Sequence, residues 1–389
     1  MAYTKEQIER ILNDLARTIN ISDELFQAAD DEYSALGEWI DKKTEEEGSH
    51  YVVYIYPQGS FALGTVIKPI SDEDDYDLDL VCELRNGQSL SARQLKVDVV
   101  KPWLADYKKT KTDIEEKRRC WHVEYEDVPN FHMDVIPALK GECDTSATQI
   151  RITDKDIERT PIYEYQGSNP KGYVRWFFTK CLQHRVSGAN VPITIYDMAK
   201  QENLRQNKNK TKLQKAVQIL KRHRDVMFDD NPDVKPISII ITTLAGQLYD
   251  GEDTILDTLI GFVSKVEGYL QGSMKDGHYC IPNPSLEDED FADKWKEHPE
   301  RQLAFFSWIR QLKTDLNLET LISKDRVSMG NGIKRAFGAT TGAVIFGVQG
   351  VNEANAVKAG TIKVNTTTGS LSETGTIPVP PSKHYGDIS

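Results

Sequence analysis

Two aspartates inside a strand-like run limit what this chain can fold into more than any other feature. The run reads YDLDLVCEL over residues 76–84, where Asp77 and Asp79 alternate with Leu78 and Leu80. Alternate residues of a strand share a face, so we expect the leucines to face a core and the carboxylates the opposite side. A carboxylate buried without a partner is costly, so that side requires cations, basic groups or water.

A third carboxylate is predicted to join them. Asp134 is the acidic residue of the otherwise apolar stretch FHMDVIPAL, and a neighbouring strand would bring it beside Asp77 and Asp79. Three converging carboxylates repel one another unless divalent cations neutralise them, and oxygen ligands without His or Cys favour Mg²⁺ or Mn²⁺ over Zn²⁺. The acidic residues 72–75 read as a solvated loop. The pattern therefore predicts a site for two Mg²⁺ or Mn²⁺ ions.

Gly59 and Ser60, a short distance ahead of the aspartates, predict a place for phosphate. If a helix begins there, its backbone N–H groups face an anion, the glycine allows close approach, and the serine hydroxyl donates a further hydrogen bond. The alternative is that the pair only caps a helix.

Composition sets the limits of the chain. The 389 residues are 39% hydrophobic and 28% charged, which is enough for two modest cores, and the net charge of −12 argues against an extended nucleic-acid partner. Five cysteines without metal-ligand spacing suggest reduced thiols. Residues 1–30 lack the apolar core of a signal peptide, and the longest apolar run, 237–246, is too short to span a bilayer. We therefore expect a cytoplasmic protein with no membrane contact.

Periodicity predicts an α+β first half and a helical second half. The expected strands are residues 51–56, 77–83, 120–125 and 131–138, with none after Leu139. The expected helices are residues 8–19, a second one capped by Ser22 and ended by Gly48, then 92–107, 172–184, 213–228, 237–248, 255–270 and 300–316. The predicted domains are residues 1–165, 166–337 and a low-complexity tail over 338–389.

The motifs Gln58-Gly59-Ser60, Asp77-Leu78-Asp79 and His132-Met133-Asp134-Val135 together resemble the polymerase-β-type nucleotidyltransferase superfamily. With QILKRHRDVMF, KPISIII and IPNPSLEDEDFADKW further on, the chain is more narrowly similar to the cGAS/DncV-like nucleotidyltransferases, the bacterial cyclic-oligonucleotide synthases of CBASS anti-phage systems. The similarity covers residues 57–295. It implies a polymerase-β-like core, a mixed β-sheet with helices, packed against a helical domain that completes a nucleotide site in the central cleft.

The resemblance also implies residue roles. The implied catalytic and metal-binding residues are Asp77, Asp79 and Asp134. The implied nucleotide-binding residues are Gln58, Gly59, Ser60, Lys221 and Ser238. Simpler alternatives stay open, since Ser238 can be a helix cap and Arg224, on the apolar face of the Lys221 helix, can pair with an internal carboxylate. Ile239 stands where base-recognising relatives often carry an aromatic residue, so the base is not predicted.

The implied activity is Mg²⁺-dependent synthesis of a cyclic di- or trinucleotide second messenger from ATP, GTP or a pyrimidine triphosphate, read by a separate effector. Alternatives are nucleotidyl transfer to a macromolecule or small molecule, as in linear tailing or NMPylation, and an inactive nucleotide-binding module. The finish of the tail, PPSKHYG, is a candidate for capture by a ubiquitin-like conjugation enzyme or another operon regulator, as the resemblance allows.

Overall fold

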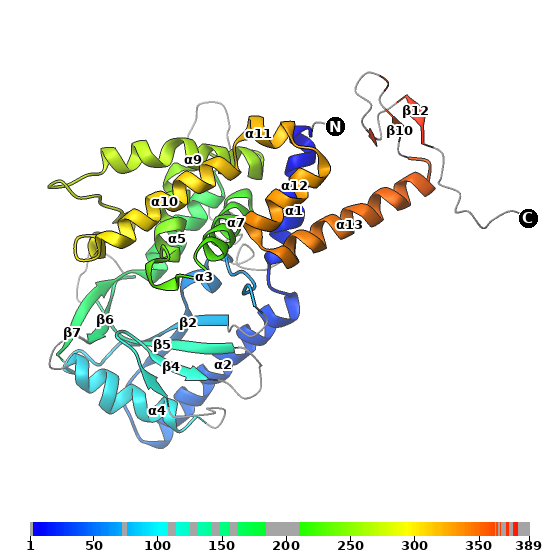
Figure 1. Cartoon of the computed structure of the whole chain (residues 1–389). Coiled ribbons are helices and arrows are strands. Elements are labelled where there is room, and N and C mark those ends of the chain that lie inside the picture. The colour runs from blue at the N-terminus through cyan, green and yellow to red at the C-terminus, as the bar shows by residue number, and fades with distance from the viewer. Residues whose placement is uncertain are drawn as a thin grey trace, which may run out of the picture.

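A mixed sheet forms one lobe of the chain (Figure 1). The computed structural model describes residues 3–71, 76–107, 114–124, 131–141, 148–155, 162–183, 210–361, 363–364, 366, 371–372 and 376–379. Within these residues the sheet has seven strands: β1 (Val53–Pro57), β2 (Tyr76–Leu84), β3 (Glu115–Glu116), β4 (Trp121–Glu124), β5 (Phe131–Lys140), β6 (Ile150–Lys155) and β7 (Tyr163–Ser168). The central strands β2 and β5 are parallel, and the other pairs are antiparallel.

The four predicted strands are confirmed, but the expectation that strands stop after Leu139 is wrong. β6 pairs with the end of β5, and β7 pairs with β6. Ile150 and Ile152 are buried on one face of β6, in a small cluster with Val81 and Ala138. These apolar residues lie on the same face of the sheet as the aspartates and bury the part of that face beyond them.

The opposite face of the sheet carries the core of this lobe. Leu78, Leu80, Cys82 and Leu84 of β2 are fully buried there. They pack with residues of α2 (Asp23–Glu46), the π-helix η1 (Gln94–Val100) and α4 (Lys101–Ala105). The predicted helix 92–107 therefore exists as a π-helix followed by an α-helix. Ser22 caps α2 as predicted, accepting a hydrogen bond from the backbone N–H of Leu25.

The second lobe is helical and lies against the aspartate-bearing face of the sheet (Figure 1). Its helices are α1 (Lys5–Ile19), α5 (Pro170–Cys181), α7 (Lys212–Met227), α8 (Ser238–Leu248), α9 (Ile255–Gly272), α10 (Pro299–Asp315), α11 (Leu318–Ser323), α12 (Arg326–Phe337) and α13 (Ala339–Lys358). It also contains the 3₁₀ turns η2 (Pro232–Val234) and η3 (Asp293–Trp295) and the hairpin β8 (Pro282–Asn283) and β9 (Leu286–Asp290). Among the described residues, no helix combines the length and apolarity needed to cross a membrane.

The predicted domain boundary after residue 165 lies close to the end of the sheet. Residue 165 falls inside β7, so the sheet runs on to Ser168. The helix α1 lies in the predicted first domain, yet Ile8, Leu12 and Leu15 pack into the helical core with Leu213 of α7. The spacing of apolar residues at three and four positions predicted the helix α1, but it did not predict that α1 packs into the helical lobe.

Within the predicted tail over 338–389, twenty residues form the helix α13 (Ala339–Lys358). Ile345 is buried, and a side chain at Gly342 would contact the backbone of Lys334 on α12. The small residues that read as low complexity thus allow two helices to pack closely. Beyond α13 the described residues form a small sheet of β10 (Lys363–Val364), β11 (Leu371–Ser372) and β12 (Ile377–Pro378), away from the body (Figure 1). The PPSKHYG finish lies outside the described residues.

A buried polar network ties α7, α10 and α12 together. The imidazole of His223, only 2% exposed, accepts the Trp308 indole N–H at 3.1 Å on Nδ1, which places the Nε2 proton toward Asp315 at 3.3 Å. Gln311 and Arg335 each donate to Asp315 at 2.7 Å. Burial works to raise the pKa of Asp315, but these hydrogen bonds outweigh it and hold the pKa well below its ordinary value.

Replacing this carboxylate, Asp315→Asn, is expected to lower the free energy of unfolding by about 2–3 kcal/mol at pH 7, because the buried His223, the partly buried Gln311 and the exposed Arg335 lose a charged acceptor. The folded-state pKa lies below the unfolded one, so the contribution is present above about pH 4 and is lost as the pH falls below it. Urea unfolding at pH 7 and pH 3.5 measures both effects. The exposed Asp98→Asn serves as the matched control, and equal unfolding curves for all three proteins at pH 7 would contradict the assignment.

Candidate active site

The structure brings the three predicted carboxylates together on the cleft face of the sheet. Asp79 of β2 lies directly opposite Asp134 of β5, and Asp77 lies on the same face, opposite His132. Burial, with the charges of Asp77 and Asp134 acting in the same direction, raises the pKa of Asp79 to about 7. Divalent cations would relieve this repulsion, so the donor set fits the metal ions that the sequence predicted.

Gly59 shapes the floor of the site. It begins the short helix α3 (Gly59–Ala62) with a φ of 59°, and an added Cβ would overlap the carboxylate of Asp79. The preceding residue, Gln58, donates its backbone N–H to the Asp79 carbonyl at 2.8 Å. Only glycine therefore allows this turn to lie directly against the DxD strand.

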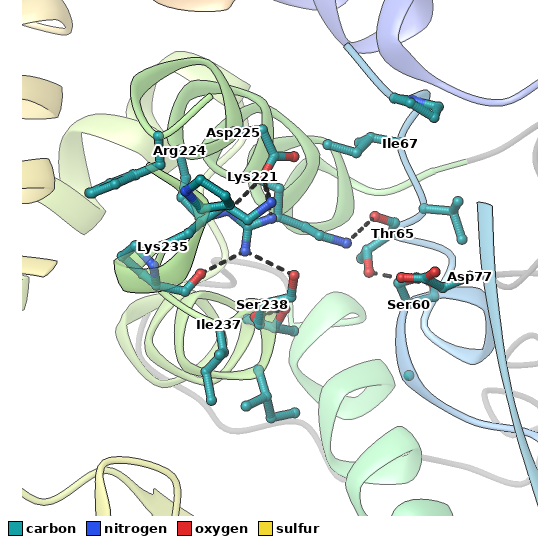
Figure 2. A pocket seen from close by; sticks show the side chains of 18 of the residues that line it. Ser60, Thr65, Ile67, Asp77, Lys221, Arg224, Asp225, Lys235, Ile237 and Ser238 are labelled. Atoms are coloured by element: carbon teal, nitrogen blue, oxygen red, sulfur yellow. Dashed lines mark hydrogen bonds and ion pairs between the residues drawn. The ribbon is translucent and has the colours of Figure 1, made fainter. Parts of the chain in front are cut away.

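A cavity of about 880 Å³ opens between the lobes in front of these residues (Figure 2). Six of the predicted site residues line it: Gly59, Ser60, Asp77, Asp79, Lys221 and Ser238. Gln58 and Asp134 are not part of this wall. The volume suits a ligand the size of a nucleoside triphosphate.

Comparisons with known proteins identify the family. Residues 53–137 match the family described as cyclic GMP-AMP synthase DncV-like, nucleotidyltransferase domain. A c-di-GMP synthase of Roseivirga ehrenbergii is 30% identical over 314 residues, which are 80% of this chain and 79% of that protein. The chain belongs to the DncV-like nucleotidyltransferases. It is accordingly a cyclic-oligonucleotide synthase of a family that uses divalent metal ions.

A second relative of this DncV-like nucleotidyltransferase is the cyclic dinucleotide synthase CdnG of Bradyrhizobium diazoefficiens, 24% identical over 327 residues, 80% of this chain and 75% of that protein. The solved structure of the Bradyrhizobium diazoefficiens CdnG in complex with GTP superposes with a TM-score of 0.67 at 21% identity, over 87% of this chain and 97% of that one. The predicted two-lobed α+β architecture is thereby confirmed.

On the helical side of this DncV-like site, α7 and α8 present Lys221, Arg224 and Ser238 (Figure 2). The buried Lys221 amine donates to the Thr65 carbonyl at 3.0 Å, and burial lowers its pKa to about 8, with the nearby Arg224 charge acting in the same direction. Arg224 donates to Asp225 Oδ1 from Nε at 2.8 Å and from Nη2 at 2.7 Å. The internal carboxylate considered for Arg224 is therefore confirmed.

Ser238 is the first residue of α8, whose N-cap is Ile237, so the alternative that Ser238 caps the helix is wrong. Its hydroxyl instead accepts a hydrogen bond from Arg224 Nη1 at 3.0 Å. Arg224 Nη1 also donates to the Pro236 carbonyl at 2.8 Å. The guanidinium thus fixes the start of α8 at the cavity wall, a positioning role that the sequence did not predict.

The segment 63–69, which we call the strap, joins α3 to the loop before β2. Side chains of α7, and that of Lys210 just before this helix, donate hydrogen bonds to the backbone carbonyls of the strap. The donor and acceptor pairs are Lys210 to Gly64 at 2.6 Å, Gln214 to Leu63 at 2.9 Å, Gln218 to Val66 at 2.6 Å, Lys221 to Thr65 at 3.0 Å and Arg222 to Pro69 at 3.2 Å. The helical lobe therefore holds the backbone that follows the Gly-Ser turn.

Two histidines that the sequence analysis did not use stand beside the carboxylates. His122 Nδ1 lies 2.9 Å from Asp134 Oδ1, and His132 Nε2 contacts Asp77 Oδ1. That contact lowers the pKa of Asp77. The sequence analysis considered only oxygen ligands, whereas the structure places two imidazoles beside the carboxylates. The spacing of His132 and Asp134 on one strand was a readable signal, whereas His122 depends on the register of β4 against β5.

Proposed function

We propose that this DncV-like nucleotidyltransferase joins two nucleotides, at least one of them from GTP, into a cyclic dinucleotide and releases pyrophosphate. The observation that carries the proposal is the opposition of Asp79 and Asp134 beside Gly59 and a cavity of nucleotide size. The guanine and the ring of two are supported by the relatives, one named a c-di-GMP synthase and the other a cyclic dinucleotide synthase.

Different residues are assigned to binding the phosphates and to binding the metal ions. Gly59 and Ser60 hold the triphosphate, and Lys221 adds a positive charge from α7. Asp77, Asp79 and Asp134 hold two Mg²⁺ or Mn²⁺ ions, which when bound neutralise the triphosphate and lower the pKa of the attacking ribose hydroxyl. Positioning and charge neutralisation provide most of the barrier reduction in phosphoryl transfer, and these residues provide both.

Part of the cavity lining suits a guanine. Asp229 and Asp233 line the cavity together with the apolar side chains of Ile237 and Ile239. Guanine presents two neighbouring N–H donors on its pairing edge, which a carboxylate accepts in bidentate fashion, whereas adenine presents one donor beside an acceptor. The isoleucine side chains offer apolar contact to the base in place of an aromatic residue.

The same proposal assigns a function to each lobe and to the product. The sheet lobe is the catalytic core, and the helical lobe completes the nucleotide site. The product acts as a second messenger on a separate effector in anti-phage (CBASS) signalling, in the cytoplasm. Capture of the PPSKHYG finish by a conjugation enzyme or another operon regulator stays a prediction.

One assay tests the activity. Purified protein is incubated with the four ribonucleoside triphosphates and Mg²⁺ or Mn²⁺, treated with phosphatase, and analysed by mass spectrometry before and after nuclease P1 digestion. A phosphatase-resistant cyclic dinucleotide that disappears when GTP is omitted is the expected result. Linear products or a labelled macromolecule would favour tailing or modification instead, and a product without guanine would overturn the GTP assignment.

Replacing the cavity lysine, Lys221→Met, is expected to raise the KM for the triphosphate about 10-fold to 100-fold, because a charge-assisted contact to phosphate is worth about 1.5–3 kcal/mol. Initial rates against GTP concentration give KM and kcat separately. Lys265→Met, which removes a lysine paired with Asp250 away from the cavity, is the control. An unchanged KM in the Lys221 variant would remove it from the triphosphate site.

A further inference from the structure

The cleft face of the sheet carries two rows of metal-ligating side chains. Strand register places Asp77, His132 and Glu124 in one row across β2, β5 and β4, and Asp79, Asp134 and His122 in the next. Each row therefore contains one imidazole and two carboxylates. Neighbouring residues in such rows have Cβ atoms about 4.5–5.5 Å apart, so their side-chain ends meet over the sheet.

Within these rows, three side chains come close enough to share one ion. One ligand atom from each of His122, His132 and Asp134 lies within 4.8 Å of the other two. Two ligands held about 2.1 Å from the same ion are at most about 4.2 Å apart, so small side-chain rotations would close the set. The imidazole rings of His122 and His132 are already only 4.2 Å apart between centroids.

The two histidines are only partly exposed to solvent. The side chains of His122 and His132 are 21% and 13% exposed, and that of Asp134 is 27% exposed. A simpler function for each imidazole is to orient one carboxylate through the observed contacts of His122 with Asp134 and His132 with Asp77. That function needs one histidine per carboxylate, and it does not require ligand atoms of both imidazoles to lie within 4.8 Å of each other and of Asp134, as they do.

Nitrogen ligands change which ion such a site prefers. Mg²⁺ takes oxygen ligands almost exclusively, whereas imidazole suits the first-row transition metals. Mn²⁺ accepts both kinds of ligand, and ions later in the row bind nitrogen more strongly. A set of two imidazoles and a carboxylate next to the Asp77–Asp79 pair therefore selects a transition-metal ion.

We propose that His122, His132 and Asp134 together bind one divalent transition-metal ion, and that this part of the site holds Mn²⁺ in preference to Mg²⁺. The inference rests on the proposed function only in taking Asp134 as a ligand of the catalytic ions. It adds two nitrogen ligands, from β4 and β5, to the carboxylates of β2 and β5.

Mn²⁺ alone is the probe, added to the full chain without nucleotide. Continuous-wave electron paramagnetic resonance gives the Mn²⁺ affinity from the free ion, and pulsed measurements detect the coupling of ¹⁴N nuclei bound to Mn²⁺. We expect ¹⁴N coupling in the wild-type protein, a weaker signal in His122→Gln and in His132→Gln, and none in the double variant. The Mn²⁺ affinity of the double variant is expected to fall about 10-fold or more, with a much smaller change for Mg²⁺.

The variants separate a ligand from a hydrogen-bond partner. Glutamine keeps a donor that can reach the carboxylates but has no imidazole nitrogen to bind the ion. His298→Gln, which alters an exposed histidine beside Glu300, is expected to leave the affinity and the coupling unchanged. Mn²⁺ bound without ¹⁴N coupling, or no bound Mn²⁺ at all, would overturn the proposal. Product formation with Mg²⁺, assayed separately, tests the proposed function independently.

Discussion

A protein that carries both Asp77→Asn and Asp79→Asn is expected to form no cyclic product while keeping its fold. In the proposed metal site these residues provide two of the three carboxylates, and amides replace the charge poorly, so we expect synthesis to fall at least about 1000-fold. Mass spectrometry of the phosphatase-treated reaction measures the product. The exposed pair Asp98→Asn and Asp106→Asn provides a matched double control, and wild-type synthesis by the Asp77 and Asp79 variant would refute the metal assignment.

The Asp79 carboxylate is also expected to affect the stability of the fold. The pKa of Asp79 is about 7 in the folded chain and about 4 when unfolded, so the folded state holds this proton more tightly. In the metal-free protein, stability is therefore lost as the pH rises from about 4 to 7. At pH 8 in a chelator, the single variant Asp79→Asn, which keeps the contact of Asp77 with His132, is expected to unfold at a higher temperature than the wild type. Adding Mg²⁺ or Mn²⁺ is expected to raise the wild-type temperature more than that of the variant.

The second large effect is expected from Gly59→Ala. The new Cβ would overlap the Asp79 carboxylate and force it out of line with Asp134, and a displacement of about 1 Å can cost about 100-fold in rate. Alanine also strains a backbone with a φ of 59° by about 1 kcal/mol. Steady-state kinetics with saturating GTP and metal measures the loss.

Gly48→Ala separates the two causes of that effect. Gly48 has a φ of 62°, but an added Cβ would meet no atom within 4 Å. The control therefore shares the backbone strain and lacks the contact with Asp79, so we expect a slightly lower melting temperature and unchanged kcat. If both variants lose activity equally, strain rather than the Asp79 contact explains the glycine.

The sequence predicted the site better than its surroundings. Period-two alternation is a local rule, so it placed Asp77 and Asp79 on one face and Leu78 and Leu80 on the other without knowledge of the neighbouring strands. His122 reaches Asp134 only through the pairing of β4 with β5, and no local pattern states that register. The helix α13 escaped prediction because its small residues gave no apolar face, although they are what its contact with α12 requires.

The attachment of the strap affects how the cavity can change during evolution. Its backbone carbonyls accept the hydrogen bonds from α7, so the attachment does not depend on which side chains the strap carries. Val66, Ile67 and Lys68 nevertheless contribute their side chains to the cavity wall. Substitutions can therefore change the side chains of this wall without moving the Gly59-Ser60 turn, to which we assign the phosphates, so relatives can differ in the shape of the cavity while the face that carries the aspartates stays unchanged.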